Sequence, residues 1–200
     1  MCALQPPSLR AGYSLVELLV TAALAVLIAA MATPTVFGAR DAIRAIGAAD
    51  YLASLLDLAR TEALKRHTNV AIRFEGAGTG FRYTMVADGN GDGVRTTQVL
   101  SGVDPALREA ERLDQQFPGV AFGLAQGVTP IEAGDEIGDG DPIRFGRSRM
   151  VSFSPTGTCT PGTLYVLGHG RRQLAVRVLG ATGRLRVLEF NFGLMTWQPR

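Results

Sequence analysis

A long apolar run near the N-terminus constrains this 200-residue chain more than any other feature. From Leu15 to Ala32 the only polar side chains are Glu17 and Thr21. These eighteen residues, at about 1.5 Å each, would make a helix of roughly 27 Å, close to the thickness of a bilayer's hydrocarbon core. An unpaired carboxylate in such a helix costs at least ~2.5 kcal/mol in lipid. That cost must be offset, and the plain alternative is that Glu17 lies near the headgroup layer and extends its carboxylate into it.

The residues that flank Glu17 carry a second pattern. Gly12 is followed by an aromatic residue, Tyr13, and then by Ser14–Glu17 and the apolar run. This arrangement resembles the prepilin processing site of type IV pilins and type II secretion pseudopilins. The resemblance implies that a prepilin peptidase cuts between Gly12 and Tyr13 and methylates the new N-terminus. Pro34 stands where many pilins also carry a proline.

The resemblance also gives Glu17 a role in assembly. Cleavage would place a new α-amine on Tyr13, and Glu17 of a neighbouring subunit would pair with it when subunits stack in axial register. An ordinary secretory signal is cut after its apolar segment, whereas this cut would leave the segment in the mature protein. The expected location is the bacterial inner membrane, with one span, a periplasmic C-terminal domain and later inclusion in a filament.

Beyond the apolar run, the helical pattern resumes and continues to about His67. Apolar residues at i, i+3 and i+4 spacing predict one stripe that packs on a sheet. Pro34 removes a backbone hydrogen bond, so a bend is expected there. The stripe consists of Ile43, Ile46, Leu52, Leu55, Leu56, Ala59 and Ala63.

The rest of the chain has the short alternating runs and glycine-rich turns of an antiparallel β domain. A short helix is expected over Asp104–Leu113, with Asp104 as its cap and Pro105 at its first position. Residues 127–141 carry five acids and no base, which predicts a solvated loop. The expected strands are 70–74, 81–86, 120–124, 143–145, 150–153, 163–167, 173–179 and 184–190, the last two joined by a hairpin at Leu179–Gly183.

Two segments of this half resemble one group of pilin-like proteins more closely. Val151–Gly157, and a closing hairpin that contains Thr182–Arg186, are similar to the GspH/FimT group of minor pseudopilins and minor pilins. The fold implied is α+β, a long N-terminal helix packed on an antiparallel two-sheet β domain. The expected parts are a leader (1–12), a transmembrane or filament-core helix (13–33), its amphipathic continuation (34–67) and a periplasmic domain (68–200).

Charge is unevenly distributed along the chain. Residues 142–200 hold nine arginines and one acid, a net charge of +8, whereas residues 1–141 hold eleven bases and seventeen acids, a net charge of −6. Arg184 and Arg186 are two apart and would share one face of a strand, where they could contact phosphates without reading sequence. Arg171, Arg172 or Arg177 is expected beside them. A matching segment in FimT-type pilins is associated with DNA capture, while the alternative is a solvated hairpin.

Two further features have weaker chemical interpretations. Asp88, Asn90 and Asp92 match the opening of a calcium-binding loop, but Val99 stands where the bidentate glutamate belongs, so a tight turn is the alternative. Cys159 would be left alone once Cys2 departs with the leader, as a buried or free thiol. The two histidines are isolated, and no serine has the setting of a nucleophile, so no enzyme is expected.

The sequence therefore predicts a minor pilin or pseudopilin whose work is assembly and binding. Its expected partners are prepilin peptidase, other pilin or pseudopilin subunits and the inner membrane. One alternative is duplex-DNA binding for DNA uptake through the basic hairpin. Another is a membrane-anchored β domain in which the prepilin motif serves only for sorting. No cofactor is expected apart from the calcium considered above.

Overall fold

The computed structural model describes residues 13–131 and 140–200, without the side chains of 31–37. The chain divides into two compact units, one ending at Ala39 and the other spanning Arg40–Arg200. The predicted leader, with Gly12 and Cys2, lies outside the described residues. So does 132–139, the centre of the predicted acidic loop.

Helix α1 (Leu15–Arg66) is the longest element and belongs to both units. It begins where the N–H of Leu18 donates to Ser14 O (3.1 Å) and ends before His67, whose φ is +53°. Its helical assignment continues through Pro34, and a bend of the axis there stays a prediction. Among the residues whose side chains are described, no helix offers an apolar stretch long enough to cross a membrane.

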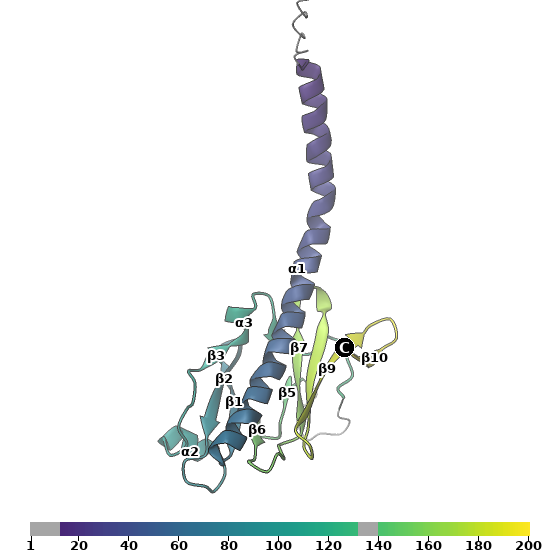
Figure 1. Ribbon diagram of the computed structural model, residues 1–200. Helices are drawn as coiled ribbons and strands as arrows, with labels where there is room; N and C mark the ends of the chain where they lie inside the picture. The colour runs from purple at the N-terminus through teal and green to yellow at the C-terminus, as the bar shows by residue number, and fades with distance from the viewer. Residues whose placement is uncertain (1–12, 132–139) are drawn as a thin grey trace, which may run out of the picture. The chain divides into compact units, whose positions relative to one another are not determined.

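The second unit contains two antiparallel sheets with the C-terminal part of α1 packed against both (Figure 1). The smaller sheet has the order β3-β2-β1-β6, and the larger has the order β10-β9-β8-β7-β4, with β5 also paired to β7. This arrangement confirms the predicted α+β fold. The strands are β1 (Val70–Ala77), β2 (Gly80–Ala87), β3 (Glu111–Arg112), β4 (Ala121–Phe122), β5 (Ile143–Arg144), β6 (Met150–Phe153), β7 (Gly162–Leu167), β8 (Gln173–Leu179), β9 (Arg184–Asn191) and β10 (Thr196–Pro199).

Small residues on α1 let the helix lie close to the sheets. The buried stripe in its C-terminal half contains five fully buried alanines, together with Leu52 and Leu56. A Cβ added at Gly168, just after β7, would lie only 2.6 Å from the Cβ of Ala45. The predicted stripe is confirmed from Leu52 onward. The assignment of Ile43 to the stripe is wrong, since its side chain is 68% exposed. The alanines are Ala45, Ala48, Ala49, Ala59 and Ala63.

The segment between β2 and β4 differs from the prediction. The expected helix over Asp104–Leu113 is absent from this described segment, and two short helices, α2 (Thr96–Ser101) and α3 (Leu113–Gln116), flank its place instead. Asp104 is buried, but its carboxylate accepts hydrogen bonds from earlier N–H groups, those of Gly89 (3.1 Å) and Arg95 (3.0 Å). It therefore closes the preceding loop and does not cap a following helix.

The larger sheet ends in a hairpin and one further strand. β8 and β9 are joined by the predicted turn, in which the N–H of Gly183 donates to Leu179 O (2.8 Å) and Gly183 has a φ of +61°. β10, which the sequence did not reveal, pairs with residues 188–191 of β9. After β10, the N–H of Arg200 donates to Val187 O (3.2 Å). Among the described residues, no backbone hydrogen bond on this side of β9 lies closer to the hairpin turn. The edge of β9 from Arg184 to Leu185 is therefore unpaired on that side.

Candidate functional site

The N-terminal part of α1 presents an apolar surface that the first unit leaves uncovered. Every side chain from Leu15 to Ala30 is exposed, including Glu17 in the first turn. The hydroxyl of Thr21 donates to Leu18 O (3.0 Å), so this polar group is satisfied within the helix. Glu17 is left as the charged group of an otherwise apolar cylinder. The positive end of the helix dipole favours a carboxylate in the first turn.

The hairpin arginines lie on the face of the larger sheet that points away from the core. Leu185 and Val187 pack against the core, so Arg184 and Arg186 alternate onto the opposite face, and both are exposed. Arg177 of β8 is directly opposite Arg186 in the sheet register. No described side chain forms a hydrogen bond or ion pair with the guanidinium group of Arg184 or Arg186. The predicted pair is thus exposed, with Arg177 beside it.

Arg171 and Arg172 lie at the other end of the same hairpin. β8 is seven residues long, which separates its two ends by about 23 Å. Arg171 donates to Gln126 O (2.9 Å) and places its guanidinium 4.9 Å from the ring centre of Phe192. Arg172 pairs with Glu189 (2.7 Å). The structure therefore does not bring these two arginines to Arg184 and Arg186, and both have internal partners.

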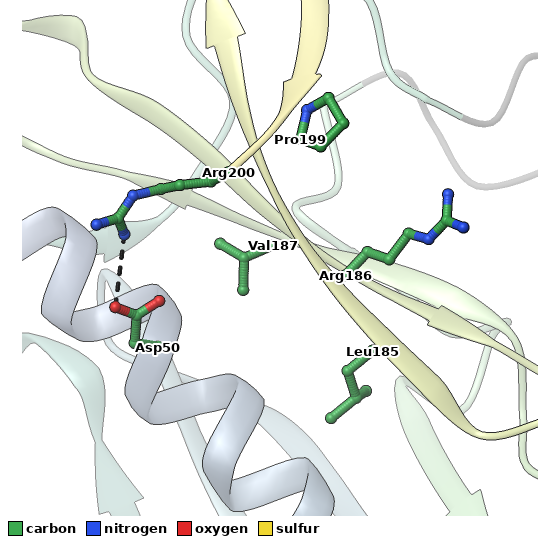
Figure 2. A pocket seen from close by; sticks show the side chains of 6 residues that line it. All are labelled: Asp50, Leu185, Arg186, Val187, Pro199 and Arg200. Atoms are coloured by element: carbon green, nitrogen blue, oxygen red, sulfur yellow. Dashed lines mark hydrogen bonds and ion pairs between the residues drawn. The ribbon is translucent and has the colours of Figure 1, made fainter.

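Other arginines of the basic C-terminal part also serve the fold. Arg149 pairs with Asp141 (2.7 Å), and Arg144 is buried over the ring of Tyr165, 6.0 Å from its centre. Arg200 reaches Asp50 of α1 (3.4 Å) beside β9, as Figure 2 shows. The net charge of this part therefore overstates the positive charge that its surface offers to a partner.

The loop that resembles a calcium site is organised by backbone N–H groups. One carboxylate oxygen of Asp88 accepts from the N–H of Asn90 (3.2 Å) and of Gly91 (2.7 Å), and the other accepts from Gly93 (2.8 Å) and from the amide of Asn69 (3.0 Å). Burial by itself would raise the pKa of Asp88, but these hydrogen bonds together hold it below its ordinary value.

Asp92, the other acid of this loop, is also engaged. It accepts from the side chain of Gln98 (3.0 Å) and lies 3.5 Å from Arg95. In the described ranges, no three acidic, histidine or cysteine side chains gather where they could hold a metal ion. The geometry is that of a tight turn.

The remaining reactive side chains in the part of the chain that the structure describes are one cysteine and two histidines. Cys159 is half-buried, and its thiol lies 3.6 Å from Leu179 O; burial raises the pKa of this thiol, although the charge of Arg60 opposes the rise. His67 follows the end of α1, and His169 begins the short 3-10 turn η1 (His169–Arg171).

One feature of the larger sheet escaped the sequence analysis. A groove of about 390 Å³ lies over its outer face, with Leu188, Phe190 and Trp197 among the lining residues and with Arg177 and Arg186 beside them. Trp197 is held in place by donating from Nε1 to Thr129 O (2.9 Å), and its ring lies 5.2 Å from that of Phe190. The alternation of residues from Arg186 to Phe190 indicates one outward face of β9. A groove forms there only together with β10, which the sequence did not reveal.

Comparison with known proteins gives one family and one structure. The profile of the family described as "Type II transport protein GspH" matches residues 48–182. The minor pseudopilin EpsH from the type 2 secretion system of Vibrio cholerae is similar in structure, with 18% identity and a TM-score of 0.45, over 73% of this chain and 97% of that one. No curated protein sequence matches significantly.

Proposed function

The chain belongs to the GspH family of type II transport proteins, and on that premise we propose that it works as a minor pseudopilin, assembled with other pseudopilin subunits into a filament. The observation that carries this proposal is the exposed apolar surface of Leu15–Ala30 with its single acid, Glu17. Such a surface is stable only when lipid or other helices cover it. Residues 13–33 would lie in the inner membrane before assembly and in the filament core afterwards.

Processing at the N-terminus is the first part of this proposal. Prepilin peptidase would cut between Gly12 and Tyr13, and the mature chain would have 188 residues, 200 minus the 12 of the leader. Its new N-terminus would be methylated. Mass spectrometry of protein extracted from membranes should find this species, and Gly12→Val should block its formation by crowding the scissile bond. An uncut chain, or a cut after Ala32, would contradict the proposal.

The role of Glu17 is tested by incorporation into the filament. Glu17→Ala should still enter the membrane, because it removes a polar group from the apolar run. It should nevertheless be depleted from filaments, because the amine of Tyr13 on a neighbouring subunit loses its partner. Glu17→Gln keeps the shape and removes the charge, so it should fail in the same way. Thr21→Ala, which changes a hydroxyl satisfied inside the helix, is the matched control.

Crosslinking between subunits in intact cells gives the measurement for these variants. Normal incorporation of Glu17→Ala would mean that Glu17 only reaches the headgroup layer. Equal loss in Thr21→Ala would point to general damage to the helix. The proposed work is assembly and binding, with no catalytic step.

Duplex DNA is a second candidate partner, supported by the exposure of Arg184 and Arg186, neither of which pairs with an acidic side chain among the described residues. Binding would be weak and independent of sequence, and it would fall steeply with salt, because each neutralised phosphate releases roughly 0.9 of a counterion. If both arginines contact phosphates, the double alanine variant should lower the log–log salt slope by roughly two units. Arg171→Ala, at the far end of β8, should leave it unchanged. Gel-shift titration that shows no binding at low salt would eliminate this candidate.

A further inference from the structure

The groove on the outer face of the larger sheet has an apolar floor and a positive end. Along β9, the outward residues Phe190, Leu188 and Arg186 follow one another at two-residue spacing, so about 13 Å of strand leads from an aromatic ring to a guanidinium group. Trp197 of β10 lies directly opposite Phe190 and extends the apolar end. Figure 2 shows Arg186 pointing away from the side of β9 that carries Leu185 and Val187.

The charges of the groove select an anion. None of the described residues that line it is acidic, while Arg186 and Arg177 face each other across β9 and β8. Arg186 has no acidic partner among the described side chains. A bound carboxylate at this end would pair with the guanidinium group of Arg186, because an arginine fork suits a carboxylate geometrically.

The composition and size of the groove suit a peptide. Trp, Phe, Met and Arg are the side chains enriched where protein interfaces gain most of their binding energy. A volume of about 390 Å³ accommodates a few side chains of an extended segment. In an extended segment laid along β9, residues i, i+2 and i+4 would face the groove together.

We propose that this groove binds an extended segment of a partner protein that carries apolar side chains at i and i+2 and a carboxylate at i+4. The apolar side chains lie over Phe190, Trp197 and Leu188, and the carboxylate pairs with Arg186 beside Arg177. This site is separate from the apolar surface of Leu15–Ala30. Loss of one interaction therefore leaves the other measurable.

The single tryptophan of the chain provides a direct probe, because Trp197 lines the groove. The full chain, purified in an uncharged detergent, is titrated with acetyl-Leu-Ser-Leu-Ser-Glu-amide while tryptophan fluorescence is followed. Two matched peptides serve as controls, one with Gln in place of Glu and one with Ser in place of both Leu. We expect a saturable change with the first peptide, binding of the Gln peptide that is roughly two- to fivefold weaker, and no saturable change with the third.

Two protein variants assign the charge effect to one residue. Arg186→Gln should weaken binding of the Glu peptide until it equals binding of the Gln peptide. Binding of the Gln peptide itself should be unchanged. Arg184→Gln is the matched control, since it is equally exposed and is not among the residues that line the groove. It should bind both peptides as the unaltered chain does. Circular dichroism of each variant verifies that the fold is retained.

Several outcomes would overturn the proposal. One is the absence of saturable change at millimolar peptide, and another is equal binding of the Glu and Gln peptides. A response to decanoate that the Glu peptide does not compete with would assign the groove to an acyl anion. A response to duplex DNA that depends equally on Arg184 and Arg186, without a response to peptide, would assign this face to nucleic acid.

Discussion

The close approach of α1 to the larger sheet depends on two small residues, and Gly168→Ala tests it. Gly168 has φ −92° and ψ 167°, a conformation open to alanine, so the substitution adds a methyl group without backbone strain. That methyl would lie 2.6 Å from the Cβ of Ala45, which is completely buried. Contacts this short do not occur between real Cβ atoms, so either the helix or the strand end must move.

The expected magnitude follows from two opposing effects. Overpacking of a filled core costs about 1–3 kcal/mol. Replacing glycine also restricts the unfolded chain, which stabilises the fold by about 0.4–1 kcal/mol. The net loss should therefore be roughly 0–2.6 kcal/mol, and the stability should be about 1–3 kcal/mol below that of a glycine-to-alanine variant at an open position. Ala45→Gly alone should cost about 1 kcal/mol through helix propensity. In the double variant the new methyl occupies the space that the old one left, so the double loss should be about 1–2 kcal/mol smaller than the sum.

Urea unfolding of a fragment that begins at Arg40 provides the assay, because residues 40–200 form one compact unit. For a slope near 2 kcal/mol/M, the midpoint of Gly168→Ala should lie roughly 0.5–1.5 M below that of a control variant that adds a methyl group in open space. Gly76→Ala is the control, since Gly76 lies in β1 with no atom within 4 Å of an added Cβ. A Gly168→Ala variant as stable as Gly76→Ala, or losses at 45 and 168 that simply add, would refute the reasoning.

Two further predictions concern the loop at Asp88 and the strand end at Gly162. The lowered pKa of Asp88 means that its stabilising contribution is present above about pH 4, near the unfolded pKa, and is lost as the pH falls through the lower folded pKa. Asp88→Asn should therefore be less stable at pH 7, with the difference shrinking in acid-titrated urea curves; a constant difference would contradict this. A Cβ at Gly162 would lie 2.0 Å from Arg144 O, so Gly162→Ala should lose more stability than Gly168→Ala in the same assay, and an equal or smaller loss would count against it.

Much of the fold could be predicted because its signals are local. β6 and β8 have the bounds expected from alternation alone, and α1 ends within one residue of the predicted His67. The hairpin at Leu179–Gly183 was visible because glycine supplies the positive φ that its last position requires. In each case neighbouring residues determine the conformation.

The errors lie where distant contacts decide the conformation. Asp104 followed by Pro105 is a good helix start in isolation, but its carboxylate is engaged by N–H groups up to 15 residues earlier, so the local cap does not form. Ile43 fits the helical period, yet the fully buried positions on this part of α1 are alanines, which allow a closer approach to the sheets than isoleucine would. A stripe predicted from the most hydrophobic residues therefore misses the helix face that packs on the sheets through small residues.

The candidate binding residues were predictable only in part. Spacing by two correctly placed Arg184 and Arg186 on one face, and the register of β8 and β9 adds Arg177. Closeness in sequence could not show that Arg171 and Arg172 lie at the end of the hairpin opposite to Arg184 and Arg186. The length of β8 separates the two pairs in space although few residues separate them in the sequence. The groove at Trp197 required β10, a short strand whose alternation is weak.

The unpaired edge of β9 has a consequence for the association of this protein with other copies of itself. A free strand edge offers its N–H and C=O groups to the edge of any other copy, and this is a common route to aggregation. Here Arg184 and Arg186 flank that edge, so two copies that paired there would bring four guanidinium groups together. The repulsion would be strongest at low ionic strength, where it is least screened. The same two side chains that could attract a partner therefore also discourage self-association, and replacing them should favour precipitation.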